Sequence, residues 1–398
     1  MSSSATRDLP YERGDLLPDT SADLAKLRAA WRIVERRRAD GTLFNLTGLE
    51  RSLDVDPAAL DVLDDDLAPA LVGERLTELA LEHLGGVPGR DDVFVANRLT
   101  AAVVAAMQVL VTPGATVVGV SPSYTHPAVV RAVRLAGGEF ADGGAVESAD
   151  LIVLTRLAVT YEALDLEQIE AVTSLGVPVF VDDAGGARVG PAIFGQPRTL
   201  ELGAIAGATG LDKYGTTGPR LGLLAGRAEL VARIRARATE LGLEARPMLW
   251  PAVVRSLEQY RPERVRELVD ATTAVGDALE ARLRGVVTRT PVAAKLEADD
   301  VLREAATRAG LQAADCPLVA YEATAALAML LLRDHGVLTV HFAALPPGTS
   351  ALLLKFLPPE TLERFGGADA LARVVDESLD ELSRVVGSRD ALAELLGV

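Results

Sequence analysis

The stretch Val177-Pro-Val-Phe-Val-Asp-Asp-Ala-Gly-Gly186 decides the fold class. Its apolar first half is typical of a strand buried on both faces, and the strand ends on the carboxylates Asp182 and Asp183. A second stretch, Ala206-Gly-Ala-Thr-Gly-Leu-Asp-Lys213, is a strand pattern of small residues followed by a lysine. Asp182 and Lys213 are 31 positions apart, which is about one strand–helix–strand unit of roughly 30 residues. We therefore expect both at the carboxyl ends of adjacent parallel strands, where ligands of open α/β sheets bind.

Short apolar runs and helical periodicities alternate on both sides of these two stretches. The pattern predicts strands over 93–96, 116–120, 151–155, 177–181, 204–208 and 221–225, and helices near 100–111, 127–135, 166–174 and 228–241. Such alternation indicates an α/β fold with a mostly parallel sheet covered by helices on both faces.

The chain is predicted to have three parts: an N-terminal helical arm over 1–45, a large domain over 46–246 and a small α+β domain over 247–398. Pro247 and Pro251 mark the second boundary. Beyond it the pattern predicts helices over 253–283, up to about 333 and over 368–386, with strands over 286–290, 293–296, 338–342 and 351–357.

Composition excludes several classes of function. The 56 acidic and 40 basic residues give a net charge of −16, which repels polyanions, so we expect no nucleic-acid partner. No apolar run approaches the roughly 20 residues of a membrane span, and the polar start is unlike a signal peptide, so we expect no membrane association and a cytoplasmic location. The single Cys316 excludes a disulfide framework, and His83, His335 and His341 lack a second ligand at metal spacing, so no metal is expected.

Lysine is rare in this chain, because only positions 26, 213, 295 and 355 carry it among 40 basic residues. A Schiff base needs a primary amine that can lose its proton, which guanidinium cannot supply. Lys26 and Lys295 are interpreted as solvated cations. Lys355 interrupts a strand, where either a cleft-facing role or a strand-edge position is consistent with the pattern. Lys213 is the predicted Schiff-base lysine.

The pairing of Asp182 with Lys213 suits pyridoxal 5′-phosphate (PLP), because a carboxylate keeps its pyridine nitrogen protonated while a lysine of lowered pKa binds its aldehyde. Each residue alone is more often a helix cap or a surface cation. The pair, with the right spacing and so few lysines, favours the cofactor interpretation.

Two further segments follow predicted strands. In Asn97-Arg98-Leu-Thr100 a strand turns into a helix whose free N–H groups suit a phosphate. His126, in Tyr124-Thr-His-Pro127, is expected to lie on the cofactor ring, with Tyr124 as the alternative. A histidine that caps the helix beginning at Pro127 explains the pattern equally well.

These segments resemble fold type I PLP-dependent enzymes, and within them the archaeal proteins similar to bacterial selenocysteine synthase (seryl-tRNA selenium transferase). The matching stretches are Asn97-Arg98, His126-Pro127, Val179-Phe-Val-Asp-Asp-Ala-Gly-Gly-Ala-Arg-Val189, Thr209-Gly-Leu-Asp-Lys213, Gly218-Pro-Arg-Leu-Gly-Leu-Leu-Ala-Gly226 and Gly242-Leu-Glu-Ala-Arg-Pro247. The stretch from Gly336 to Gly348 is similar too.

The resemblance implies a seven-stranded sheet and a homodimer or larger assembly. It implies that Lys213 binds PLP covalently, Asp182 pairs with the pyridine nitrogen, Ala184 packs under the ring and His126 stacks on its other face. By the same analogy the phosphate is held by Asn97, Arg98, Thr100 and Thr209, and the substrate by Tyr124, Arg188 and Lys355. The family's usual carboxylate-binding arginine is absent, because the chain has Leu353-Leu354-Lys355 in its place.

The leading functional hypothesis is elimination, replacement or a related transfer at the α-carbon of a small amino acid, with Lys213 as the base for the Cα proton. Aminotransfer with a keto acid and racemisation are the alternatives. A tRNA-dependent selenium transferase is a less favoured hypothesis, because the acidic chain shows no evident tRNA-binding module. The non-enzymatic alternative is a PLP-binding regulatory or structural protein that has lost turnover.

Overall fold

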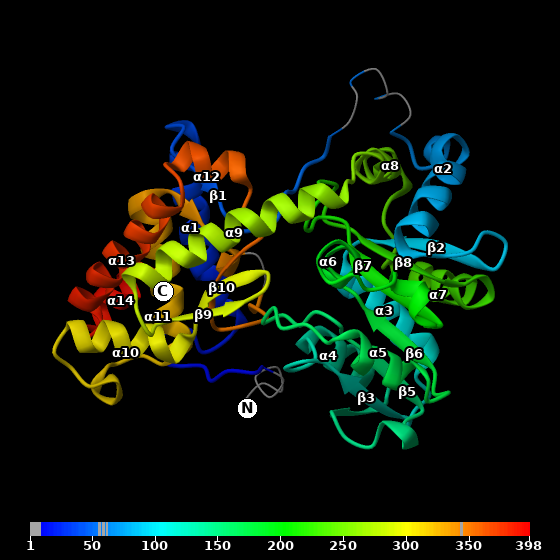
Figure 1. Cartoon of the computed structure of the whole chain (residues 1–398), viewed down its shortest axis with the longest axis horizontal. Helices are drawn as coiled ribbons and strands as arrows, with labels where there is room; N and C mark the ends of the chain where they lie inside the picture. Colours follow the sequence, from blue (N-terminus) through cyan, green and yellow to red (C-terminus); the bar gives the residue numbers. More distant parts are fainter. Residues whose placement is uncertain (1–8, 55–56, 58–59, 61–62, 343–344) are drawn as a thin grey trace. The chain divides into compact units, whose positions relative to one another are not determined.

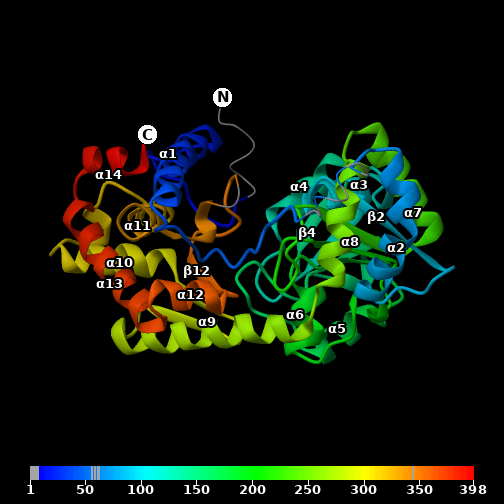
Figure 2. The ribbon, with the colours of Figure 1, turned by 90° about the horizontal axis from the view of Figure 1, so that it is seen from above.

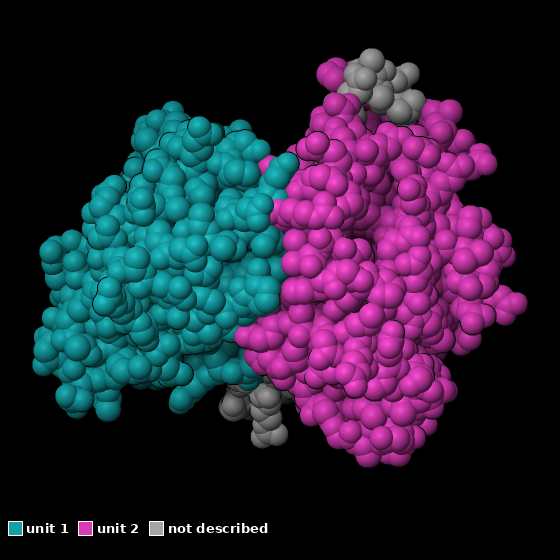
Figure 3. All heavy atoms as spheres, viewed as in Figure 1, with its two compact units in different colours: residues 1–49, 267–398 teal, residues 50–266 magenta. Residues whose placement is uncertain are grey.

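The computed structural model of this chain describes residues 9–54, 57, 60, 63–342 and 345–398. The described chain forms two compact units (Figures 1 and 3). The large unit is Glu50–Arg266, and the small unit joins the chain up to Leu49 with Glu267–Val398. The unit boundaries therefore fall after Leu49 and Arg266, whereas the sequence-based domain boundaries were placed after residues 45 and 246. The N-terminal helix therefore belongs to the same compact unit as the C-terminal part of the chain.

A seven-stranded sheet forms the centre of the large unit, with the order β2-β8-β7-β6-β5-β3-β4. The strands are β2 (Asp91–Ala96), β3 (Thr116–Val120), β4 (Glu139–Asp142), β5 (Leu151–Leu154), β6 (Val179–Asp182), β7 (Ala206–Gly210) and β8 (Gly222–Arg227). From β7 to β4 all neighbours are parallel, whereas β8 is antiparallel to both β7 and β2. The prediction of a mostly parallel α/β sheet is confirmed.

Helices cover both faces of this sheet (Figure 1). They are α2 (Leu67–Leu84), α3 (Leu99–Leu110), α4 (Pro127–Leu135), α5 (Leu166–Thr173), α6 (Gly186–Ile193), α7 (Ala228–Glu240) and α8 (Trp250–Glu258). Alternate residues of β2 enter different cores, because successive strand side chains point to opposite faces. Phe94 packs with residues of α3, α4 and α7, whereas Val93 and Val95 pack with residues of α2 and α8.

Several elements were not predicted from the sequence. Strand β4 is mostly exposed at the sheet edge and lacks an apolar run. The expected single helix over 253–283 is two helices, because α8 ends at Glu258 and α9 (Pro262–Arg282) starts at a proline. Helix α8 packs against α2 within the large unit.

The small unit is built around the apolar helix α11 (Ala320–His335), which is buried along most of its length. Helix α1 (Thr20–Ala39) lies beside it, as Figure 2 also shows. The small unit also contains α9 from Glu267 onward and the helices α10 (Ala298–Arg308), α12 (Pro359–Phe365), α13 (Ala368–Val385) and α14 (Arg389–Leu396). Strands β9 (Val287–Thr290), β10 (Ala293–Leu296) and β12 (Leu352–Lys355) form an antiparallel sheet, and β1 (Phe44–Asn45) pairs in parallel with β11 (Val337–Leu338).

Three predictions for this unit are wrong. Residues Val340–Phe342 form a 3-10 turn rather than a strand. Lys26 is buried, where its amine contacts Asp23 at 3.6 Å and the Tyr321 hydroxyl at 3.2 Å. Lys295 is buried as well, within 3.1 Å of Glu297. Periodicity placed Lys26 on a polar face, but partners brought by other parts of the chain compensate its burial.

In the described part of the chain, no helix is both long and apolar enough to cross a bilayer.

Candidate active site

Lys213 lies in the turn that follows β7, and the fold fixes its main chain closely. The Thr216 hydroxyl donates to the Lys213 carbonyl at 2.8 Å, and the Lys213 N–H donates back to the same hydroxyl at 3.3 Å. Gly210 leaves room for the lysine stem, because a Cβ there would lie 3.1 Å from Lys213 Cε. Burial lowers the pKa of Lys213, while Asp212 and Asp182 oppose that shift. The amine therefore gives up its proton more readily than a solvated lysine does.

Asp182 is the last residue of β6, the strand that neighbours β7, and it pairs with Ala208 in the sheet register. The side chain is buried, and its Oδ1 has no hydrogen-bond partner among the described residues. Burial raises the pKa of Asp182 to about 6, helped by Asp183 and opposed by the positive charge of Lys213. The expected neighbourhood of Asp182 and Lys213 is thus present, and it contains a buried acceptor that lacks a donor.

Asp183, the next residue, is fully engaged in the fold. Its two carboxylate oxygens accept from Arg156 Nε at 2.9 Å and Nη2 at 2.6 Å, and the Thr199 hydroxyl donates to it at 2.7 Å. Both members of the ion pair are inaccessible to solvent. Of the two adjacent carboxylates, only Asp182 is therefore available to a ligand.

Arg188 of α6 lies with Thr209 and Ala184 in one buried polar cluster. Its Nη2 donates to the Thr209 hydroxyl at 3.0 Å and to the Gly210 carbonyl at 2.6 Å, and Nη1 donates to His83 at 3.1 Å. The Thr209 hydroxyl also donates to the Ala184 carbonyl at 3.4 Å. Arg188 thus ties the turn after β6 to the end of β7. Its substrate-binding role stays a prediction, as do the cofactor contacts of Ala184 and Thr209.

His126 caps helix α4, since its Nδ1 accepts from the Ala128 N–H at 3.1 Å. Burial lowers its pKa to about 4, and the positive charges of Lys213 and Arg131 act in the same direction. The ring is therefore neutral at physiological pH and feels the charge of Lys213. The capping geometry is observed, and a stacking role is compatible with it. Tyr124 accepts at its carbonyl from the Ser121 hydroxyl.

Helix α3 starts among three predicted phosphate-site residues, since Asn97 and Arg98 precede it and Thr100 is its second residue. The Asn97 side chain donates to the Gly242 carbonyl at 3.2 Å, and its backbone N–H bonds Leu243. Arg98 is the residue before the helix and its side chain makes no cap, so the first N–H groups of α3 have no side-chain acceptor from this position. Arg98 and Thr100 are both exposed. This arrangement fits the expected anion-binding helix start.

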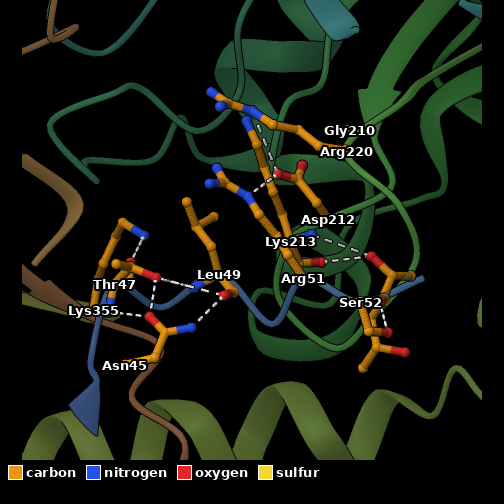
Figure 4. A network of polar contacts seen from close by, with 12 residues as sticks. Asn45, Thr47, Leu49, Arg51, Ser52, Gly210, Asp212, Lys213, Arg220 and Lys355 are labelled. Atoms are coloured by element: carbon orange, nitrogen blue, oxygen red, sulfur yellow. Dashed lines mark hydrogen bonds and ion pairs between the residues drawn. The ribbon is translucent and has the colours of Figure 1, made fainter. Parts of the chain in front are cut away.

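Sequence reasoning missed a set of cations around Asp212. Arg51 Nε lies 2.7 Å from the Asp212 carboxylate, and Arg220 Nε lies 3.8 Å from it (Figure 4). Burial and the nearby positive charges of Arg51 and Arg98 together lower the pKa of Arg220 to about 10, against the opposing effect of Asp212. Arg220 stands in the quoted stretch Gly218–Gly226 and could have been singled out there, whereas nothing in the sequence ties Arg51 to a residue 161 positions away.

In the small unit, Lys355 holds the segment that leads away from β1. Its amine donates to the Thr47 carbonyl at 2.8 Å and the side chain is buried (Figure 4). The Thr47 hydroxyl is itself 2.7 Å from Asn45 Oδ1. Gly48 has a positive φ of 67°, and any side chain there would collide with the Lys355 carbonyl. The predicted substrate-binding role of Lys355 stays a prediction.

The sheet order, the carboxylate at the end of β6 and the lysine after β7 define the class as fold type I PLP-dependent proteins. The structure matches an aspartate aminotransferase from Thermotoga maritima with a TM-score of 0.59 at 14% identity, covering 94% of this chain and all of that one. It matches Escherichia coli YbdL, described as having a methionine aminotransferase function, with a TM-score of 0.53 at 17% identity over 89% of this chain and 96% of the other. Likeness at this level of identity shows the fold.

In sequence, the chain is 32% identical over 350 residues to a UPF0425 pyridoxal phosphate-dependent protein of Methanothermobacter thermautotrophicus, covering 85% of this chain and 88% of the relative. The chain belongs to the UPF0425 family of pyridoxal phosphate-dependent proteins. No family model matches it.

Proposed function

We propose that this chain is a PLP-dependent transferase or lyase that acts at the α-carbon of a small amino acid, with Lys213 as the residue that carries the cofactor. The observation that carries the proposal is the buried, partnerless Oδ1 of Asp182, electrostatically coupled to a lysine of lowered pKa on the neighbouring strand end. Membership of a family of PLP-dependent proteins supports the cofactor.

The residues present fit this cofactor at both of its ends. A buried acceptor without a donor costs about 1–3 kcal/mol, and Asp182 Oδ1 is such an acceptor. A protonated ring nitrogen would supply the missing donor. Arg98, Arg220 and the start of α3 offer positive charge and N–H groups for a phosphate. Asn97, Thr100 and Thr209 stay proposed members of that phosphate site.

When bound, PLP supplies an electron sink that stabilises negative charge developing at the substrate α-carbon. Lys213 takes and returns a proton at that carbon, since its lowered pKa leaves more of the amine in the neutral, basic form. Asp182 holds positive charge at the ring nitrogen. His126 contributes an uncharged ring surface, because its pKa of about 4 keeps it neutral.

The same residues serve several reaction types, since the bond broken at Cα depends on how the substrate is held. We favour elimination, replacement or a related transfer, with aminotransfer and racemisation as alternatives. Tyr124, Arg188 and Lys355 are the proposed substrate contacts. We also propose that the protein is cytoplasmic and forms a homodimer or larger assembly. Its resemblance to the archaeal proteins similar to selenocysteine synthase stays part of the proposal.

Borohydride reduction of the PLP-loaded protein, followed by peptide mass mapping, tests the assignment. The adduct should be on Lys213, should disappear in Lys213→Ala and should persist in Lys355→Ala, the control at a buried lysine of the small unit. An adduct that persists elsewhere in Lys213→Ala refutes the proposal. With a panel of amino acids, pyridoxamine formation would indicate aminotransfer, whereas released keto acid and ammonia would indicate elimination.

A further inference from the structure

Tyr161 and Tyr214 have an unusual backbone. Among the described residues only three that are not glycine have a positive φ, namely Tyr161 at 69°, Tyr214 at 48° and Phe356 at 47°. This left-handed region is unfavourable for residues with a side chain, and it persists where surrounding contacts enforce it, often at functional sites. Two of the three residues touch each other, and one of them directly follows Lys213.

The contact between the two tyrosines joins their hydroxyl groups. The oxygen atoms lie 2.6 Å apart, and the rings meet edge to face with centroids separated by 6.3 Å. Both side chains are buried, and burial raises the pKa of each phenol well above its ordinary value. Both phenols therefore stay protonated at physiological pH, so this short contact is a hydrogen bond between neutral hydroxyls.

The pair links the ends of three neighbouring strands. Tyr161 lies in the turn after β5, where its N–H donates to the Ala158 carbonyl at 3.0 Å. Tyr214 lies in the turn after β7. Its ring packs on Gly185, beyond the end of β6, so closely that a Cβ on Gly185 would collide with it. Since β5, β6 and β7 are adjacent in the sheet, the pair spans the edge that carries Asp182 and Lys213.

We propose that Tyr161 and Tyr214 form a positioning brace that holds the turn of Lys213 at a fixed place relative to Asp182. The Tyr161 hydroxyl fixes the outer end of the Tyr214 side chain, and the ring of Tyr214 rests on Gly185. The φ of +48° at Tyr214 then sets the direction in which the chain leaves Lys213. This inference rests on the proposed function of Lys213, and it names positioning residues rather than groups that contact substrate.

The main chain around Lys213 supports this role. Thr216 closes the turn through its hydroxyl, and Gly215 follows Tyr214 with a φ of 97°. Glycine adopts such a φ without strain, whereas a tyrosine keeps a positive φ only where surrounding contacts hold it there. The bond from Tyr161 supplies that constraint, and it acts on the residue bonded directly to Lys213.

The test removes single hydroxyl groups by Tyr161→Phe and Tyr214→Phe. In the PLP-loaded protein, the visible absorbance of the Lys213-linked cofactor is titrated with pH. We expect both variants to move its apparent pKa by at least ~0.5 unit, about a threefold change in ionisation, toward the value measured for the same cofactor on a small primary amine in water. The double variant should give no larger shift than either single one, because removing either hydroxyl already breaks the hydrogen bond between them.

A second readout needs no cofactor. Competitive acylation of the full-length, cofactor-free chain measures the pKa of each of its four lysines. A loosened turn admits water, so the pKa of Lys213 should rise toward its ordinary value in both variants while Lys26 stays unchanged. Tyr321→Phe is the matched control, because its buried hydroxyl contacts Lys26 in the small unit. This variant should alter the pKa of Lys26 and leave the pKa of Lys213 unchanged.

The brace is overturned if the pKa of Lys213 is unchanged in both Tyr161→Phe and Tyr214→Phe. It is also overturned if Tyr321→Phe changes the pKa of Lys213 equally, since that would indicate general destabilisation. These outcomes are distinct from failure of the proposed function. If wild-type Lys213 carries no cofactor, the absorbance readout is lost, but the acylation readout still decides on the brace.

Discussion

The exchange of Asp182 for asparagine is expected to have opposite effects on stability with and without cofactor. In the cofactor-free fold the Asp182 carboxylate is buried and Oδ1 lacks a donor. Its pKa rises from 3.8 to about 6. A raised carboxyl pKa means that the folded state favours the protonated form. The charged form therefore destabilises the fold above pH about 6, and that penalty disappears below pH about 4.

The size of this penalty follows from the shift of about two pKa units. At 1.36 kcal/mol per unit, it is about 3 kcal/mol at pH 8. Asp182→Asn keeps the shape and removes the charge. The cofactor-free variant should therefore be more stable than wild type by up to about 3 kcal/mol at pH 8. With cofactor bound the order should reverse, because the variant loses the carboxylate proposed to hold positive charge on the ring nitrogen.

Urea unfolding, followed by circular dichroism at pH 8 and pH 5, measures both effects. The matched control is Asp183→Asn, which breaks a buried ion pair with Arg156 and should cost about 3–5 kcal/mol with or without cofactor. If cofactor-free Asp182→Asn is no more stable than wild type at pH 8, or if the difference does not shrink toward pH 5, the assignment of Asp182 as the partnerless carboxylate is wrong.

Three further outcomes are expected. Arg220→Gln should weaken PLP binding at least tenfold in an equilibrium titration, since it removes a cation beside the proposed phosphate site, whereas Arg75→Gln, in an exposed ion pair, should not. The His126 ring proton resonances should stay constant between pH 5.5 and 8, because its pKa is about 4; a transition near pH 6.5 would contradict its burial. Lys355→Met should lower the unfolding free energy by about 1–3 kcal/mol, because the Thr47 carbonyl loses its donor, and should leave borohydride trapping intact; loss of trapping would count against the assignment of Lys213.

The sheet could be predicted from the sequence because its signals are local. Strands β3, β5 and β6 are short apolar runs, and β7 is a run of small residues that ends before the lysine. The spacing of Asp182 and Lys213 then placed them on neighbouring strands. Strand β4 lacks such a signal, since it lies exposed at the edge of the sheet.

Contacts between distant parts of the chain could not be predicted. Nothing in the sequence links Arg51 to Asp212 or Tyr161 to Tyr214, because each pair meets only through the fold. For the same reason Lys26 was interpreted as solvated, although Asp23 and Tyr321 compensate its burial. Periodicity reports which face of an element is apolar, and it carries no information on which polar residue meets another inside.

Burial acts on Asp182 and Lys213 in the same chemical sense, because it favours the neutral form of both. It raises the pKa of the acid and lowers that of the amine, and their mutual attraction only partly opposes each shift. A ligand that brings a cationic nitrogen to the acid and uses the neutral amine as a nucleophile removes both penalties at once. If PLP binds between Asp182 and Lys213 as proposed, these two pKa shifts favour its binding, because the cofactor-free fold already disfavours the charged form of each group.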